Sequence, residues 1–200
     1  MTSEKITIGV IGAGTMGRGV VQLFASAGHP VRCFDAAPGA AAEAVQAVVG
    51  MVQRGVEKGR VTQAEVDALA ARISACESMP ELADCGLLIE AIVEDLKAKR
   101  DLFQALEAVV SPSAILATNT SSLIVSEIAA GCRHPERVAG LHFFNPVPLM
   151  KVAEVIAAVR TAPAVLGALS ALVSGTGHRA VAAADQPGFL VNHAGRGYYT

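Results

Sequence analysis

The sequence predicts an α/β fold: a doubly wound, mostly parallel β-sheet with helices on both faces. Short apolar runs of strand length alternate with segments whose apolar residues recur every three or four positions. Hydrophobic residues make up 52% of the 200 residues, but aromatic residues make up only 4%. Because strands that are buried on both faces are rich in small and branched apolar side chains, this composition favours a parallel sheet.

The N-terminal part of the chain predicts one strand–turn–helix–strand unit. An apolar, β-branched run is followed by a glycine-rich turn and then by a helical pattern that stops at a further glycine. The elements are a strand at 6–11, a turn at 12–17, a helix at 16–27 that ends at Gly28, and a strand at 30–34 that Asp35 closes. This order within about thirty residues is that of a βαβ unit.

The rest of the chain continues the alternation of helices and strands. Thr62 and Glu65 have the spacing of a capping box, so we expect a helix to begin at Thr62. The other expected elements are helices at 40–58, 96–110 and 164–173, strands at 87–92, 114–117, 138–144, 152–156 and 178–182, a turn at 187–188, and a helix that starts near Phe189.

The turn after the first strand has the glycine spacing of a dinucleotide-binding turn. Gly12 permits a sharp bend, Gly14 lets the backbone approach a pyrophosphate, and Gly17 lets the helix pack closely on the sheet. The N–H groups and the dipole at the start of the helix favour phosphate charge. We therefore predict a Rossmann-like fold in which this turn, including Thr15 and Met16, binds a dinucleotide. The alternative is a glycine-rich turn between ordinary elements.

Asp35 indicates which dinucleotide is bound. It ends the second strand, about twenty residues after the turn, where a carboxylate accepts hydrogen bonds from the ribose hydroxyls of adenosine. The same charge repels a 2′-phosphate, so we expect NAD rather than NADP. In the alternative interpretation, Asp35 is a solvated strand end.

Two further strand ends carry polar side chains. Residues 118–122 place hydroxyl and amide groups after a buried strand, where ligands bind in this architecture, although one of them also suits a helix cap. His142 falls at the end of a later strand, and Glu154 lies on a strand that can return beside it. A single His is more often structural, but a nearby carboxylate and dinucleotide site favour a catalytic role.

With these motifs, the chain resembles the 3-hydroxyacyl-CoA dehydrogenases of fatty-acid oxidation and related acyl-CoA pathways. The resemblance spans nearly the whole chain and rests on the segments 12–17, 90–94, 119–122, 141–148 and 187–192. The sequences Asn-Thr-Ser-Ser and His-Phe-Phe-Asn-Pro are much more specific than the glycine turn. The resemblance implies NAD-dependent oxidation of (S)-3-hydroxyacyl-CoA to 3-oxoacyl-CoA.

The resemblance also implies roles for individual residues. It makes His142 the catalytic base and Glu154 its partner, and it puts Ser121 and Asn192 beside the reacting carbon. The implied cofactor contacts are Glu94, Lys99, Ser121 and Asn145. Lys58 is implied to meet the CoA phosphates, although a Lys near a helix end also complements the helix dipole.

These roles agree with the chemistry of alcohol oxidation. Hydride transfer to a nicotinamide requires removal of the hydroxyl proton, which a His can accept near neutral pH. Glu154 on the other ring nitrogen would fix the tautomer and stabilise the imidazolium. Ser121 and Asn192 would donate hydrogen bonds to the substrate oxygen as charge develops on it. This scheme needs no metal.

The resemblance also predicts how the chain is divided. We expect an NAD-binding Rossmann-like domain at 1–186 and the start of a C-terminal helical domain at 187–200. In the family that domain supplies a dimer interface and closes the acyl pocket, so we expect a homodimer for the full-length protein and poor catalysis by these 200 residues alone. His193 stands where the family usually has Arg. We expect little effect, because the implied contact belongs to Asn192.

Composition excludes several other classes of protein. The formal net charge is −2 and there is no basic stripe, which argues against nucleic acid as a partner. Charges, Pro and Gly interrupt the apolar stretch at 152–174, and the N-terminus lacks the pattern of a signal peptide, so we predict neither a membrane span nor a leader. Four dispersed cysteines without a CxxC pair argue against disulfides and zinc and fit a reducing cytoplasm.

Two other functions are compatible with these residues. A related dehydrogenase of a free hydroxy acid or sugar acid would use the same His–Glu pair, and it would differ in lacking a CoA contact. A module that binds NAD without catalysis would share the glycine turn. The joint presence of Ser121, His142, Glu154 and Asn192 argues against that second alternative.

Overall fold

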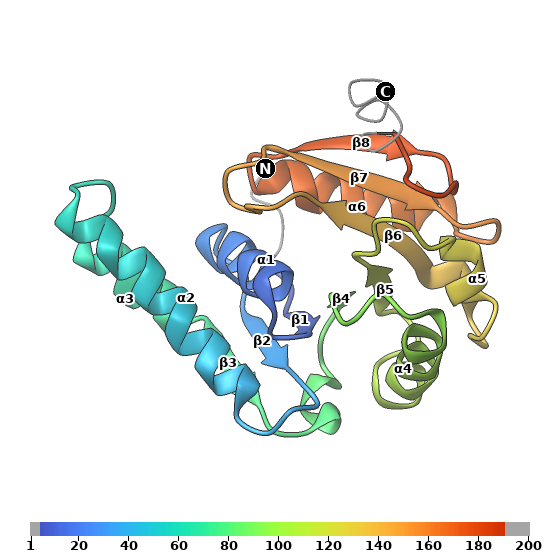
Figure 1. Ribbon diagram of the computed structural model, residues 1–200, viewed down its shortest axis with the longest axis horizontal. Coiled ribbons are helices and arrows are strands. Elements are labelled where there is room, and N and C mark those ends of the chain that lie inside the picture. Colours follow the sequence, from blue (N-terminus) through green and yellow to red (C-terminus); the bar gives the residue numbers. More distant parts are fainter. Residues whose placement is uncertain (1–4, 191–200) are drawn as a thin grey trace.

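The computed structural model describes residues 5–190 and confirms the doubly wound α/β architecture (Figure 1). Within these residues one sheet has the strand order β3-β2-β1-β4-β5-β6-β7-β8. Neighbouring strands are parallel, except β6 and β7, which are antiparallel. The strands are β1 (Ile8–Ile11), β2 (Val31–Phe34), β3 (Ile73–Cys76), β4 (Leu87–Glu90), β5 (Ile115–Thr118), β6 (Val138–Phe143), β7 (Val152–Ala157) and β8 (Arg179–Ala183).

Helices cover both faces of this sheet. Leu87 and Ile89 of β4 belong to one cluster of buried apolar side chains, whereas Leu88 belongs to a second, because successive side chains of a strand point to opposite faces. The first cluster includes α1, α2 and α6, and the second includes α4 and α5. The helices are α1 (Thr15–Ser26), α2 (Ala40–Glu57), α3 (Gln63–Ala70), α4 (Leu96–Val109), α5 (Val125–Ala129) and α6 (Pro163–Gly175), with short 3₁₀ helices at Met79–Leu82 and Pro135–Arg137.

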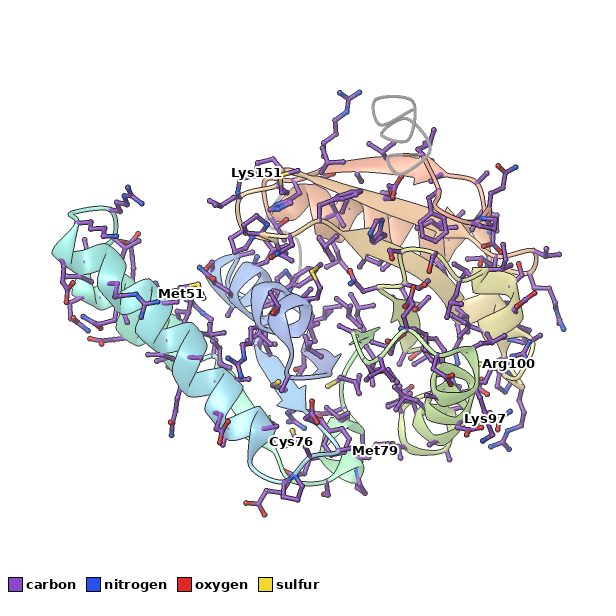
Figure 2. All side chains as sticks on the ribbon, in the orientation of Figure 1. Met51, Cys76, Met79, Lys97, Arg100 and Lys151 are labelled. Carbon is purple, nitrogen blue, oxygen red and sulfur yellow. The ribbon has the colours of Figure 1, made fainter. Side chains whose placement is uncertain are left out.

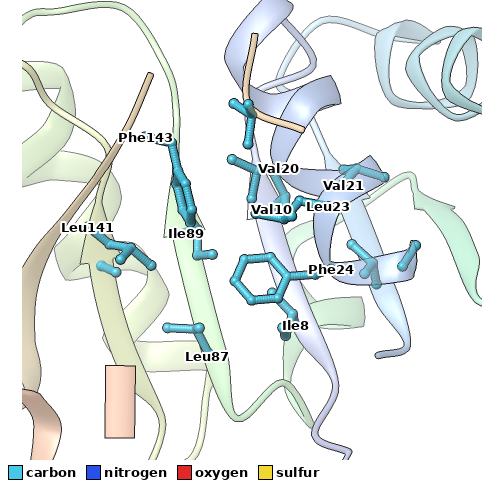
Figure 3. Close-up of a cluster of buried hydrophobic side chains, with 14 of the residues drawn as sticks. Ile8, Val10, Val20, Val21, Leu23, Phe24, Leu87, Ile89, Leu141 and Phe143 are labelled. Atoms are coloured by element: carbon cyan, nitrogen blue, oxygen red, sulfur yellow. The ribbon is translucent and has the colours of Figure 1, made fainter. Parts of the chain in front are cut away.

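The first cluster holds α1 against the sheet (Figure 3). Phe24 of α1 is fully buried, and its ring meets the ring of Phe143 edge to face, with centroids 6.1 Å apart. Val20 packs beside it, above Val10 of β1. The start of α1, and with it the glycine turn, is thereby fixed relative to the end of β1.

The strand order determines where a ligand can bind. From β1 the chain adds β2 and β3 on one side, and it then crosses over to place β4 on the other side of β1. In open α/β sheets, such a reversal leaves a crevice outside the carboxyl ends of the two strands. The ends of β1 and β4, and next to them β5 and β6, therefore define the edge at which functional residues are expected.

The structure adds one strand, one α-helix and the two 3₁₀ helices that the sequence did not predict, and it shortens other elements. Strand β3 and helix α5 were missed, because each has only four or five residues and a weak apolar pattern. Strand β4 stops at Glu90 instead of continuing to Ile92, because the Glu90 carboxylate accepts a hydrogen bond from Ile92 N at 2.8 Å and turns the chain. The helix expected from Phe189 is not present at 187–190, which form a turn, and the rest of that prediction lies outside the described residues.

The predicted capping box is confirmed at the start of α3. Thr62 and Glu65 exchange hydrogen bonds there, where α3 packs against α2 (Figure 1). Charged side chains such as Lys97, Arg100 and Lys151 project outward from the ribbon (Figure 2). No helix among residues 5–190 combines the length and the hydrophobicity needed to cross a membrane.

Candidate active site

The glycine turn contains two positions at which a Cβ would not fit. Gly12 has φ of 108°, and a Cβ there would collide with the carbonyl of Ala91. A Cβ on Gly17 would collide with the carbonyl of Gly12. Gly14 differs, because a Cβ there would meet no atom within 4 Å. The turn thus leaves open space at Gly14, directly before the first helical residue of α1.

Asp35 lies beside this turn. One of its carboxylate oxygens accepts a hydrogen bond from Ala13 N at 2.7 Å, and the other accepts one from Ala37 N at 2.9 Å. A pocket of about 680 Å³ joins Asp35 to Gly12 and Gly14. The other residues that line it are mostly apolar: Ile11, Phe34, Ala36, Met79, Ala91, Ile92, Val93 and Leu102. A carboxylate at the rim of an apolar pocket suits an adenosine, whose ribose is polar and whose base is flat and largely apolar.

A second pocket, of about 330 Å³, gathers most of the remaining predicted residues. It shares Ala91 and Ile92 with the pocket at Asp35, so the two pockets adjoin across the loop after β4. Its lining consists of Met16, Ala91, Ile92, Glu94, Lys99, Asn119, Ser121, His142, Phe143, Phe144 and Asn145. An elongated ligand can therefore extend from Asp35 past the glycine turn to His142.

His142 and Glu154 form a buried pair across β6 and β7. They are directly opposite each other in the antiparallel register, so their side chains lie on the same face of the sheet. His142 Nδ1 lies 2.7 Å from Glu154 Oε2, and the two side chains are 7% and 0% exposed. Because a carboxylate can only accept, it favours the tautomer with the proton on Nδ1. Nε2 then carries the lone pair.

Aromatic rings surround the His142 ring. The centroid of the Phe144 ring is 4.4 Å from that of His142, and the centroid of the Phe189 ring is 5.7 Å from it. The second oxygen of Glu154, Oε1, accepts a hydrogen bond from Leu190 N at 2.9 Å. The segment before residue 191 thus reaches the His–Glu pair directly.

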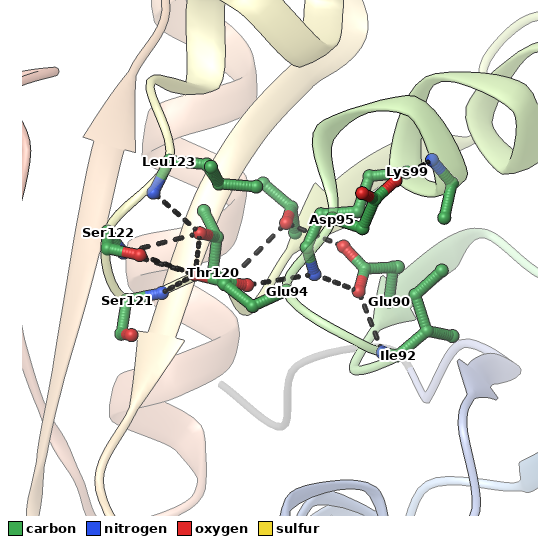
Figure 4. A network of polar contacts seen from close by, with 11 residues as sticks. Glu90, Ile92, Glu94, Asp95, Lys99, Thr120, Ser121, Ser122 and Leu123 are labelled. Carbon is green, nitrogen blue, oxygen red and sulfur yellow. Dashed lines mark hydrogen bonds and ion pairs between the residues drawn. The ribbon is translucent and has the colours of Figure 1, made fainter.

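A polar network around Glu90, Glu94 and Lys99 supports another part of the wall of this pocket (Figure 4). Lys99 Nζ lies 2.5 Å from Glu90 Oε1, and both side chains are only 1% exposed. Glu90 Oε2 accepts a hydrogen bond from Thr118 at 2.6 Å, and Lys99 also lies 3.3 Å from Glu94 Oε2. Lys99 thus forms part of the pocket wall while it is paired with two carboxylates.

Glu94 connects this network to the Asn-Thr-Ser-Ser segment. Its Oε1 accepts hydrogen bonds from the Thr120 hydroxyl at 2.5 Å, from Ser121 N at 3.0 Å, and from both N and Oγ of Ser122. Burial by itself raises the pKa of the Glu94 carboxyl, but these hydrogen bonds and the Lys99 charge outweigh it and hold the pKa below its usual value. Glu94 is therefore ionised at neutral pH and fixes the backbone of Ser121.

Two residues of this site lie in segments that the sequence analysis singled out, but they were given no individual role there. For Glu90, only its burial shows that it must be paired. Asn119 uses its side-chain oxygen to accept a hydrogen bond from Phe143 N at 2.9 Å, which ties the end of β5 to the end of β6. A polar residue directly after an apolar run was the available signal in both cases.

Two predicted residues are not brought to this edge by the described structure. Lys58 is exposed at the C-terminal end of α2 and lines neither of the two pockets. Asn192 lies outside the described residues. The other predicted residues line one pocket or the other, except Thr15 and Gly17, which lie within the glycine turn and at the start of α1, and Glu154, which lies behind His142.

The fold and the turn define the class of this chain. A doubly wound sheet whose first strand enters a glycine turn, with an acidic residue at the end of the second strand, is a Rossmann-type dinucleotide-binding domain. The family described as 3-hydroxyacyl-CoA dehydrogenase, NAD binding domain, matches residues 7–186. The chain belongs to this family, which confirms the resemblance seen in the sequence and NAD as the cofactor.

Individual relatives agree with this assignment. The chain is 39% identical over 194 residues to 3-hydroxyadipyl-CoA dehydrogenase of Escherichia coli, and the match covers 97% of this chain and 41% of that protein. It is 42% identical over 183 residues to a probable 3-hydroxybutyryl-CoA dehydrogenase of Bacillus subtilis, with 92% and 64% covered. The crystal structure of 3-hydroxybutyryl-CoA dehydrogenase from Escherichia coli matches with a TM-score of 0.95 and 38% identity, covering 98% of this chain and 42% of that one. The chain thus spans between 41% and 64% of these two curated relatives.

Proposed function

We propose that the protein catalyses the NAD-dependent oxidation of (S)-3-hydroxyacyl-CoA to 3-oxoacyl-CoA. The observation that carries this proposal is the His142–Glu154 pair, joined at 2.7 Å, at a pocket that adjoins the site of the glycine turn and Asp35. The names of the relatives supply the class of substrate, and the buried pair supplies a base of the kind that alcohol oxidation requires.

The proposed mechanism assigns the proton to His142. Bound NAD supplies the hydride acceptor. With Nδ1 protonated against Glu154, the Nε2 lone pair accepts the proton of the substrate hydroxyl. The Glu154 charge stabilises the imidazolium that results, and in the reverse direction the imidazolium returns the proton. Ser121 and Asn192 donate hydrogen bonds to the substrate oxygen.

The remaining assignments belong to the same proposal. Glu94, Lys99, Ser121 and Asn145 contact the cofactor, and Lys58 faces the CoA phosphates. The NAD-binding domain comprises residues 1–186, and residues 187–200 begin a helical domain through which the full-length protein forms a homodimer. What supports the cofactor contacts is that all four residues line one pocket with His142.

The direct test is reduction of acetoacetyl-CoA by NADH, followed by the loss of NADH absorbance, with the complete protein and with free acetoacetate in a parallel assay. Turnover of the CoA ester alone supports the proposal. Turnover of the free acid instead would make the protein a related dehydrogenase of hydroxy acids. Binding of NADH without turnover of either compound would indicate a binding module.

Replacing Gly14 by Ala is expected to weaken NADH binding without destabilising the fold. The added methyl group meets no protein atom within 4 Å, but it occupies the space through which a pyrophosphate would approach. We expect the Kd for NADH to rise by about tenfold or more, which corresponds to about 1.4 kcal/mol. Fluorescence titration measures this change. Gly50→Ala is the matched control, because a Cβ on Gly50 of α2 also meets no atom within 4 Å; equal NADH affinities for wild type and Gly14→Ala would contradict the prediction.

Asp35 is expected to determine the preference for NADH over NADPH. Removal of its charge in Asp35→Asn should lower the ratio of the Kd for NADPH to the Kd for NADH by about tenfold or more, because the repulsion of a 2′-phosphate is lost. The ratio is the informative quantity, since loss of a hydrogen bond to Ala13 N or Ala37 N weakens binding of both cofactors alike. Asp67→Asn on the exposed side of α3 is the control. Tighter binding of NADPH than of NADH by the wild type would refute the assignment.

A further inference from the structure

We infer that residues 185–190 form a clamp that holds His142 and Glu154 in place, and that Asp185 and Phe189 are positioning residues for the proposed proton transfer. The inference rests on the function proposed above. Neither residue is part of the proposed catalytic or cofactor-binding set.

The inner end of the clamp contacts both members of the pair. Leu190 N donates to Glu154 Oε1 at 2.9 Å, while Glu154 Oε2 lies 2.7 Å from His142 Nδ1. Because the two carboxylate oxygens are held in different directions, the carboxylate is restrained from rotating away from His142. Phe189, which is only 4% exposed, places its ring 5.7 Å from the ring of His142.

The backbone of the clamp is held in an unfavourable conformation. Phe189 has φ of 44°, and it is the only residue other than glycine with a positive φ in the part of the chain that the structure describes. A bulky side chain in this region carries an energetic cost and persists only where the surroundings impose it. Glycine would remove this cost but would also remove the ring that covers His142. The strain is therefore associated with placing that ring.

The outer end of the clamp is fastened by Asp185. Its carboxylate accepts hydrogen bonds from Val125 N at 2.7 Å, from Ser126 N at 2.8 Å and from the Ser126 hydroxyl at 2.5 Å. The same hydroxyl oxygen accepts a hydrogen bond from Val159 N at 2.9 Å, shortly after the end of β7. Asp185 thereby ties the clamp to α5 and to the strand that carries Glu154. Both ends of a six-residue segment are thus attached to elements on which the proposed chemistry depends.

The expected consequence of loosening the clamp is a loss of turnover with little loss of cofactor affinity. The clamp contacts the His–Glu pair, whereas Glu94 and Lys99, the charged groups that line the same pocket, are held by hydrogen bonds and ion pairs that do not include clamp residues. Misplacement of a catalytic group by about 1 Å can cost about 10²-fold in rate. If Asp185 had only a structural role, its replacement would lower stability, and it would change kcat and the Kd for NADH together or leave both unchanged.

The test is Asp185→Ala in the complete protein, assayed by NADH-dependent reduction of acetoacetyl-CoA. We expect kcat to fall by about 10- to 10²-fold while the Kd for NADH changes by less than about twofold. In a Glu154→Gln background the same substitution should lower kcat by less than about threefold, because the clamp acts through Glu154. Amide hydrogen exchange at residues 188–190 should accelerate in Asp185→Ala. Asp101→Asn, on the exposed part of α4, is the control with unchanged kcat.

Substitutions of Phe189 provide a second, independent test of the clamp. Phe189→Gly relieves the backbone strain but removes the ring, so kcat should fall to a similar extent, whereas Phe189→Tyr should retain most of it. If Asp185→Ala does not fold, Asp185→Asn and Phe189→Gly decide the matter by the same readouts. The clamp would be refuted if those variants kept the full kcat. It would also be refuted if the Asp185 substitution lowered kcat by the same factor in the wild-type and Glu154→Gln backgrounds. An inactive wild type, or a fully active His142→Gln variant, would instead overturn the proposed function. In that case, unchanged amide exchange at residues 188–190 in Asp185→Ala would overturn the clamp on its own.

Discussion

Replacing His142 by Gln is expected to lower turnover of acetoacetyl-CoA by about 10²- to 10⁴-fold while NADH affinity stays nearly unchanged. Gln keeps a polar side chain of similar length but cannot carry the proton between Nε2 and the substrate oxygen. Cofactor affinity is expected to persist, because the glycine turn and Asp35 lie around the adjoining pocket. Stopped-flow or steady-state assays of the complete protein, together with NADH titration, measure the two quantities separately.

Glu154→Gln should also lower turnover, since it removes the charge that stabilises the imidazolium while it retains an oxygen that accepts from Nδ1 or from Leu190 N. The chain offers a matched control in a second His–Glu pair. His134 lies 3.1 Å from Glu136, but these side chains are 55% and 50% exposed, so His134→Gln is expected to leave turnover unchanged. Near-normal turnover of His142→Gln would exclude His142 as the base.

Replacing Lys99 by Met is expected to destabilise the fold by about 3–5 kcal/mol, because it leaves the Glu90 carboxylate buried without its counter-charge. Such a loss is a large part of the stability of an ordinary domain. The expected readout is a lower urea midpoint with an unchanged denaturant slope. NADH binding should weaken in parallel, since Lys99 and Glu94 together shape the wall of the pocket.

Two variants distinguish the effect of leaving a buried charge without its partner from the effect of losing a lysine. Lys97→Met removes a lysine from the same helix, but Lys97 is 84% exposed and pairs with Asp101 at the surface, so its loss should change the urea midpoint little (Figure 2). The double variant Glu90→Gln and Lys99→Met removes the fully buried Glu90 charge together with its partner and leaves only Glu94, which is 36% exposed, without Lys99. It should therefore be more stable than Lys99→Met alone. A Lys99→Met protein as stable as Lys97→Met would show that the buried pair contributes little.

The elements that the sequence predicted correctly are those whose signal is local. An apolar run, a glycine spacing and a capping box each act through the conformational preferences of neighbouring residues. For this reason β1, α1, α2 and α3 could be predicted from the amino-acid sequence alone. Strand β3 could not, because its four residues alternate only weakly and it forms by pairing with β2. The register between β6 and β7 likewise depends on contacts between strands.

The sequence by itself determined the family, the fold class and the identity of His142 and Glu154 as a pair worth testing. Those conclusions depend on which residues are present and in what order. Only the tertiary structure decided that Glu90 must be paired with Lys99, that Glu94 is held by the residues around Ser121, and that Leu190 reaches Glu154. The reason is physical: burial and hydrogen-bond partners are properties of segments far apart in the chain, and the cost of a buried charge or a strained residue exists only once those segments meet.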